Sequence, residues 1–300
     1  MYIALIVLLS LCPQLASAGS WEDRRSNLDQ VAIYEKYRIF YSLSGKDSLP
    51  GERRGDKDKN GIPDFIESVG VRLTDADKFF RHEVGLIPPL KSKRYIGKAH
   101  YIDVNILDFS NNKKGPKNGI AYDGTPKFNR SISGQISLNA LVIDLSGSVR
   151  LKTNSVEHEL FHLYQNGYTF FKNRWYTEGT ARWAELIMLG RIGNGASLPD
   201  SKITRERLFN KTYAANSFWN ELIIKIDSNT QGKNFIKALL EELDYSDNIA
   251  TRKRGLNYSN WKESEQRSAD NNIYIWKATL KAIQRTGNTS DSEINGLYKI

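Results

Sequence analysis

The segment His158-Glu159-Leu160-Phe161-His162 contains two of the four histidines in this 300-residue sequence. Side chains four residues apart lie on one face of an α-helix, about one turn from each other, so both imidazoles can reach a single metal ion. Glu159 stands beside the first histidine, where its carboxylate can accept a proton from a water on that ion. The segment therefore predicts a helix that supplies His158 and His162 as zinc ligands and Glu159 as a general base.

The residues around this motif predict the limits of the helix. Asn154, followed three residues later by Glu157, is typical of a capping box at a helix start. Asn166-Gly167 is a typical helix end. A helix over residues 154–166 follows.

A third ligand is predicted sixteen residues after His162, where Glu178 lies near the start of a second predicted helix over residues 176–190. A connection of that length lets the two helices pack side by side and direct Glu178 at the same ion. Two histidines and a glutamate are a ligand set of catalytic zinc sites, in which the fourth position stays open for water. The chemistry expected is metal-assisted hydrolysis of a peptide bond.

The HELFH motif, followed at this distance by WYTEGTARWAE (175–185), resembles the gluzincin branch of the zinc metalloproteases. With the KYRIFYSLSG, NGIPDFIE and YIDVNILD segments, residues 36–225 are similar to a family of secreted bacterial metalloproteases in this superfamily. The resemblance implies a zincin-like α+β fold. It has a mixed sheet and the active-site helix in an N-terminal lobe, and a helical C-terminal lobe.

The resemblance also implies a donor for the oxyanion that forms during hydrolysis. No histidine follows His162, so a histidine donor of the thermolysin type is excluded. Aminopeptidase-type gluzincins use a tyrosine on a helix after the third ligand, which implies Tyr213 here; Tyr168 and Tyr176 are the alternatives.

One position departs from the thermolysin-like pattern. Arg182 stands four residues after Glu178, where those sequences have an acid that orients a zinc histidine. Glu185 shares a helix face with Glu178 and is either that partner or a member of an ordinary ion pair.

Residues 56–67, DKDKNGIPDFIE, match the EF-hand calcium loop at every diagnostic position. Gly61 occupies the sharp turn, and Pro63 replaces the usual aliphatic residue. The expected oxygen ligands are Asp56, Asp58, Asn60, the Ile62 carbonyl, Asp64 and Glu67. A single structural Ca²⁺ site is predicted; an acidic turn that caps the following helix is the alternative.

Hydrophobic patterning predicts strands first and helices later, which favours the α+β class. The predicted strands cover residues 36–43, 101–107 and 134–139, with a loop rich in Gly, Asn and Lys between the last two. The predicted helices cover residues 63–83, 154–166, 176–190, 204–226, 231–243 and 272–286, with a long connection over 244–271. A substrate peptide is expected to pair with the edge of the 134–139 strand.

Residues 1–18 have the apolar run and the small-x-small end of a signal peptide, so a secreted or periplasmic protein is expected. Cleavage removes the only cysteine and therefore excludes disulfides in the mature chain. An N-terminal lobe over 19–170 and a C-terminal lobe over 171–300 follow.

The net charge of +9 is scattered along the chain, which argues against a nucleic-acid partner and predicts a solvated surface. No stable membrane insertion is expected after signal cleavage.

These features predict a secreted, calcium-stabilised zinc metallopeptidase that acts on peptides or proteins, most simply as an endopeptidase. Aminopeptidase action is one alternative, although no acidic motif for a substrate N-terminus was found. A non-catalytic secreted metal-binding or adhesion protein on the same fold is another, and the presence of Glu159 argues against it.

Overall fold

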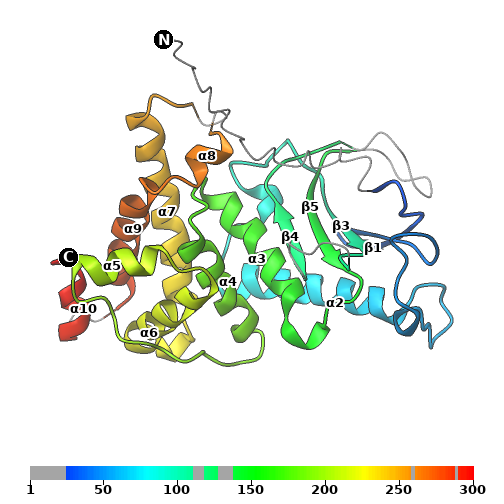
Figure 1. Ribbon diagram of the computed structural model, residues 1–300, viewed down its shortest axis with the longest axis horizontal. Helices are drawn as coiled ribbons and strands as arrows, with labels where there is room; N and C mark the ends of the chain where they lie inside the picture. Colours follow the sequence, from blue (N-terminus) through cyan, green and yellow to red (C-terminus); the bar gives the residue numbers. More distant parts are fainter. Residues whose placement is uncertain (1–24, 111–117, 128–137, 258–260, 288–289) are drawn as a thin grey trace, which may run out of the picture.

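The computed structural model describes residues 25–110, 118–127, 138–257, 261–287 and 290–300 (Figure 1). The protein has the α+β architecture expected from its sequence. Its strands are β1 (Gln30–Tyr34), β2 (Tyr37–Tyr41), β3 (Tyr101–Leu107), β4 (Gly119–Tyr122) and β5 (Ala140–Ser146). Its helices are α2 (Asp64–Lys78), α3 (Ser155–Tyr168), α4 (Arg174–Ile187), α5 (Lys202–Phe209), α6 (Asn216–Ile226), α7 (Lys233–Lys253), α8 (Glu263–Gln266), α9 (Asn271–Thr286) and α10 (Ser292–Leu297).

The strands form one mixed sheet in the order β1-β2-β3-β5-β4. The central strands β2, β3 and β5 run parallel, whereas β1 and β4 pair antiparallel with their neighbours. A mixed sheet was expected. The edge position of β4 matters most for the site, because one side of this strand has no partner strand in the described chain.

Helices α2 and α3 pack on the sheet, α2 mainly against β1 and β2 and α3 against β4 and β5. Alternate residues of the strands, such as Ile39, Val104 and Ile143, are fully buried in this interface. Figure 1 shows the sheet on one side, α5 to α10 on the other, and α3 and α4 between them. Directly after α2, a π-helical turn extends over Phe79–Glu83.

One buried apolar core continues from the sheet into the helical half. In the helical half, Trp175 of α4 stacks on Trp219 of α6, with ring centroids 5.3 Å apart and planes 9° apart. The Trp219 indole N–H also donates a hydrogen bond to the backbone oxygen of Trp175 at 2.8 Å. This contact fixes α4, which carries one of the expected ligands, against α6. The division at residue 170 stays a prediction.

The predicted helices agree with the observed ones except in two places, and the short helices α8 and α10 were not predicted. The predicted helix over 204–226 is interrupted after α5, and a 3-10 turn (η5, Tyr213–Ala215) leads into α6. The predicted connection over 244–271 is wrong in its first part, because α7 continues to Lys253. Apolar residues continue at helical spacing across the break between α5 and α6, so periodicity did not reveal this break. They become sparse at the end of α7, so periodicity placed the end of that helix too early.

The predicted strand over 134–139 is not observed as such. Residues 134–137 lie outside the described residues, and Leu138 and Asn139 precede the strand that is present, β5. Every residue of β5 is buried, so its sequence ALVIDLS lacks the alternation that marks a half-exposed strand. Short edge strands β1 and β4 were also missed, and β4 falls in the predicted loop.

The predicted signal peptide, residues 1–18, lies outside the described residues. Within the described ranges, none of the helices combines the length and the apolar character needed to cross a bilayer.

Gly179 permits the close approach of α4 and α6, and its substitution tests this packing. A Cβ atom at this position would lie 2.6 Å from Cδ1 and Nε1 of the buried Trp219 ring. We expect Gly179→Ala to lower the free energy of unfolding by about 1–3 kcal/mol, because the indole has to move within a packed core. Urea denaturation followed by tryptophan fluorescence measures this change.

The matched control is Gly296→Ala in α10, where an added Cβ meets no atom within 4 Å. It should leave the free energy of unfolding equal to or about 0.4–1 kcal/mol above that of the wild type. Equal stability of Gly179→Ala and the wild type would show that α4 and α6 are not tightly packed.

Candidate metal centre

Helix α3 carries the HELFH segment, and nearly all of its residues are buried. Asn154, which precedes it, has φ +53° and makes no side-chain cap, so the predicted capping box is wrong. Its amide instead accepts a hydrogen bond from Arg72 of α2 and donates one to the backbone oxygen of Glu185 at 2.7 Å. Asn154 therefore joins α2, α3 and α4 at the start of the zinc-motif helix.

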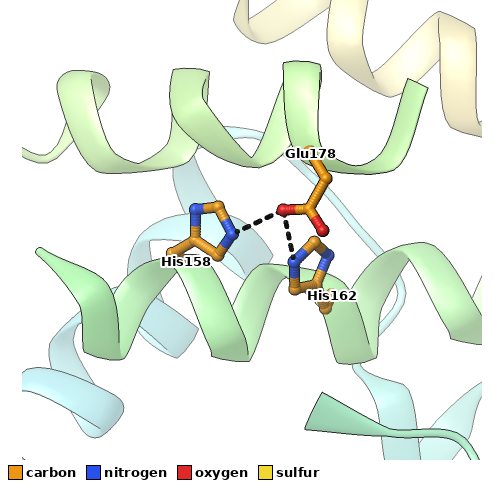
Figure 2. A group of neighbouring side chains, drawn as sticks. All are labelled: His158, His162 and Glu178. Carbon is orange, nitrogen blue, oxygen red and sulfur yellow. Dashed lines mark hydrogen bonds and ion pairs between the residues drawn. The ribbon is translucent and has the colours of Figure 1, made fainter. Parts of the chain in front are cut away.

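The structure brings His158, His162 and Glu178 together between α3 and α4 (Figure 2). One Glu178 oxygen, Oε2, lies 3.3 Å from Nε2 of His158 and 3.6 Å from Nε2 of His162. One ligand atom from each residue lies within 4.8 Å of the other two. The spacing is that of three groups that can share one ion, as expected from the sequence.

The second ring nitrogen of each histidine has its own partner. His158 Nδ1 lies 2.7 Å from Oε1 of Glu185, and His162 Nδ1 lies 2.7 Å from Oε1 of Gln165. Because both partners are acceptors, each Nδ1 donates its proton to them, and Nε2 is the ring atom that would bind a metal ion in place of its own proton.

Gln165 is the site residue that sequence analysis missed. Its amide nitrogen donates to the backbone oxygen of Thr177 at 2.9 Å and to Oγ1 of Thr180 at 2.7 Å, and this fixes the amide oxygen toward His162. The available signal was its spacing, because a residue three positions after His162 lies on the same helix face.

Glu185 is both a partner of a histidine and a member of an ion pair, the two roles that the sequence left open. One carboxylate oxygen contacts His158, and the other lies 3.4 Å from the Arg182 guanidinium. The acid that orients the first histidine therefore comes seven residues after Glu178 rather than four.

The charges of the cluster are strongly coupled. Burial lowers the pKa of His158, but its hydrogen bonds to Glu178 and Glu185 outweigh this and raise the pKa to about 10. Burial raises the pKa of Glu178, yet hydrogen bonds from both imidazoles outweigh it and hold the pKa well below its usual range. Glu178, which is partly buried, thus stays ionised because positive charge faces it.

Glu159 lies in the same site and is 7% exposed. Burial raises its pKa, and the neighbouring histidines oppose this shift. The backbone of Ala121 in β4 also lowers its pKa. A Cβ atom added to Gly119 would lie 2.7 Å from Glu159 Cγ, so the absence of a side chain at Gly119 lets β4 lie directly against this carboxylate.

Of the three candidate tyrosines, only Tyr213 lines the site. Its ring centroid lies 6.0 Å from that of His158. Burial, followed by the charges of Glu178 and Glu159, raises the pKa of Tyr213 to about 12. Tyr168 accepts a hydrogen bond from the Ile87 backbone, and Tyr176 is fully buried. Tyr213 lies on the 3-10 turn η5 rather than on the expected helix.

A cavity of about 950 Å³ opens over these groups. Its walls are β4 with the following residue, α3, α4 and part of α8, and it contains His158, Glu159, His162, Glu178 and Tyr213. The described strand beside the cavity is β4. Residues 134–137 of the predicted substrate strand lie outside the described residues, so that assignment stays a prediction.

No protein-family model, curated protein or solved structure matches this chain. The gluzincin resemblance therefore rests on the quoted motifs and on the geometry of the cluster.

The predicted calcium loop is a compact turn before α2. Gly61 has φ +88°, and its backbone N–H donates to Oδ2 of Asp56 at 2.8 Å. The Asn60 side-chain amide donates to Glu67 at 2.8 Å and to Asp58 at 3.0 Å. Four of the expected ligand residues are thus in contact.

The other two expected ligands lie at the end of the loop. The backbone N–H of Ile62 donates to the Asn60 side chain at 2.8 Å, and Asp64 accepts from the Lys57 backbone at 3.1 Å. Across the described chain, the His158, His162 and Glu178 cluster is the only group of three or more His, Cys, Asp or Glu side chains spaced for one ion. The loop acids accept hydrogen bonds from the loop backbone and from Asn60.

Gln165 gives a direct test of the metal centre. Gln165→Met keeps a side chain of similar length but removes the acceptor for His162 Nδ1. We expect zinc affinity to fall about 10–100-fold, because groups that orient metal-binding histidines contribute that much. Competition with a chromogenic chelator measures the affinity.

Gln284→Met, at an exposed position of α9, is the matched control and should bind zinc like the wild type. Circular dichroism verifies that both variants are folded. An unchanged zinc affinity in folded Gln165→Met would exclude an orienting role for this amide.

Proposed function

We propose that this protein is a secreted zinc endopeptidase with a zincin-like fold, in which His158, His162 and Glu178 hold the metal. The observation that carries the proposal is the convergence of two Nε2 atoms and one carboxylate beside Glu159 and an edge strand, all in one cavity. On a solvated surface helix, the HELFH motif would not bring two Nε2 atoms, the Glu178 carboxylate, Glu159 and an edge strand together.

The donor set fits zinc. Two imidazole nitrogens and one carboxylate oxygen are three typical protein ligands of a catalytic zinc, and they leave a position for water. Both histidines have Nδ1 bonded to an acceptor, as in metal sites where the other ring nitrogen binds the ion. When bound, zinc lowers the pKa of a water and polarises the scissile carbonyl group.

Glu159 acts as the general base. It takes a proton from the attacking water as the new C–O bond forms, and delivers that proton to the leaving nitrogen as the C–N bond breaks. Burial raises its pKa, which suits the first step because the carboxylate accepts a proton more readily. Ala121 and Glu159 both line the cavity.

Tyr213 donates a hydrogen bond to the oxyanion that develops on the substrate. Its position beside His158 and Glu178 puts the hydroxyl next to the ligand cluster. A neutral phenol is the required form, and its raised pKa keeps the proton in place at neutral pH.

The substrate binds along β4. β4 lines the cavity, and one side of this strand has no partner strand in the described chain, so an extended peptide can add to it through main-chain hydrogen bonds. Such binding places the peptide backbone across Glu159 and the ligand cluster, which suits cleavage of internal bonds.

Endopeptidase action is favoured over aminopeptidase action by the acids that line the cavity. Asp123 pairs with Lys172 and Arg94, and Glu263 pairs with Lys172 and Arg267. An aminopeptidase needs a carboxylate available for the substrate amino group. Among the described lining residues, the acids outside the catalytic cluster already have cationic partners.

We also propose a structural Ca²⁺ site in the 56–67 loop. The loop has the left-handed glycine that the turn requires and joins Asp56, Asn60 and Glu67 through hydrogen bonds. Oxygen donors from consecutive residues suit this hard cation.

Glu159→Gln tests the mechanism. The variant keeps the size of the side chain but cannot take a proton, so kcat/KM on an unfolded, fluorescence-quenched protein substrate should fall by orders of magnitude while zinc content stays at one ion per chain. Activity and metal content are measured on residues 19–300 with zinc and calcium supplied.

The control is Glu206→Gln, at an exposed position of α5, which should retain full activity. Zinc-loaded wild type that cleaves nothing would contradict the proposed activity and favour a binding protein. Absence of zinc from the wild type would contradict the ligand assignment itself.

Calcium dependence is tested separately by thermal and urea unfolding at constant zinc. At 10 mM Ca²⁺, a site with an affinity typical of extracellular modules adds about 1.4–2.7 kcal/mol to the free energy of unfolding. Asp56→Asn should lose this gain, whereas Asp75→Asn, at an exposed position of α2, should keep it. An equal gain in all three proteins, or a gain with Mg²⁺ as large as with Ca²⁺, would contradict the site.

A further inference from the structure

Helix α4 directs two arginines into the cavity, one on each side of the ligand Glu178. Arg174 lies four residues before Glu178 and Arg182 four residues after it, and all three line the cavity. At 1.5 Å per residue, the two arginine Cα atoms are about 12 Å apart along the helix, with Glu178 midway.

Both guanidinium groups keep hydrogen-bond donors available. Arg174 is 51% exposed and has a contact with Glu178 at 3.3 Å, while its guanidinium carbon lies 5.8 Å from the centre of the Tyr213 ring. Arg182 is 44% exposed and lies 3.4 Å from Glu185, and its Nε is buried, so its terminal nitrogens are the donors that can reach a ligand. A guanidinium has five N–H donors, so these long contacts leave most of them unused.

The acids that contact these arginines also contact the histidines of the site. Glu178 contacts both histidines, and Glu185 contacts His158 at 2.7 Å. The positive charges of Arg174 and Arg182 are therefore only partly compensated.

The remaining cations of the cavity are different. Lys172 lies 2.6 Å from Glu263 and 3.0 Å from Asp123, and Arg267 lies 2.6 Å from Glu263. Short ion pairs of this kind occupy the donors. Arg174 and Arg182, which flank Glu178, differ from these two cations because their ion-pair contacts are longer.

We propose that Arg174 and Arg182 select peptides with acidic side chains on both sides of the scissile bond. This inference rests on the proposed peptidase function and names its substrate class. An extended peptide advances about 3.3 Å per residue, so half of the 12 Å separation corresponds to about two residues on each side of the bond. Carboxylates bind guanidinium groups through paired, charge-assisted hydrogen bonds. The net charge of +9 adds a long-range attraction for acidic substrates.

The test compares four fluorogenic peptides that differ at the second residue before and the second residue after the scissile bond. The residues at these positions are Glu-Glu, Glu-Gln, Gln-Glu and Gln-Gln. With zinc-loaded wild type we expect kcat/KM to rise about tenfold for each glutamate, and the gain to shrink in 0.5 M salt. Equal rates on all four peptides would overturn the proposal.

Single variants assign each preference to one arginine. Arg174→Gln should remove the preference at one of the two positions, and Arg182→Gln the preference at the other. Arg207→Gln, at an exposed position of α5, is the matched control and should keep both preferences. Zinc content is measured in each variant, because a loss of metal in Arg174→Gln would reveal a role in holding Glu178 instead. Preferences that survive in both zinc-loaded variants would also overturn the proposal.

Binding separates this inference from the proposed function. Fluorescence anisotropy with zinc-loaded Glu159→Gln measures the affinity for the labelled Glu-Glu and Gln-Gln peptides without turnover. Tighter binding of Glu-Glu that is lost in Arg174→Gln and Arg182→Gln backgrounds would support the inference even if the wild type cleaved nothing. Cleavage without any preference would retain the peptidase and reject the inference, and equal binding without cleavage would reject both.

Discussion

The Glu178 carboxylate, held between the imidazoles of His158 and His162, is the interaction on which the rest of the arrangement depends. A buried carboxylate is costly unless positive charge faces it, and here α3 supplies that charge to a residue of α4. The two helices must keep a fixed register for this contact to form. The stacking of Trp175 on Trp219 and the missing side chain at Gly179 hold α4 in the required place.

Sequence predicted the parts of the site that depend on local geometry. The spacing of His158 and His162 follows from helical periodicity, and Glu178 follows from one short connection between neighbouring helices. The contacts that orient the histidine rings depend on how the helices pack against each other. Gln165 was missed because its role requires Thr177 and Thr180 of another helix to fix its amide.

The errors in the sheet have a related cause. Alternation identifies strands with one exposed face, and β3 is close enough to that pattern to have been predicted. Strand β5 is buried along its whole length, and β4 has only four residues, so neither gives a periodic signal. The strand β4 beside the cavity was therefore not predicted, although a mixed sheet beside the helix that carries the HELFH motif was expected. Tyr213 was placed correctly beside the cluster but on a 3-10 turn, because the break between α5 and α6 does not interrupt the apolar pattern.

Asn154 links helices from three parts of the chain. Its amide joins Arg72 of α2 to the backbone of Glu185 in α4, and Arg72 also pairs with the buried Glu157 at 2.8 Å. The first turn of α3 cannot fray without breaking contacts to both neighbouring helices. The amide hydrogens around His158 should therefore exchange with solvent only through a larger cooperative opening that includes α2 and α4. Between such openings, His158, His162 and Glu178 stay together.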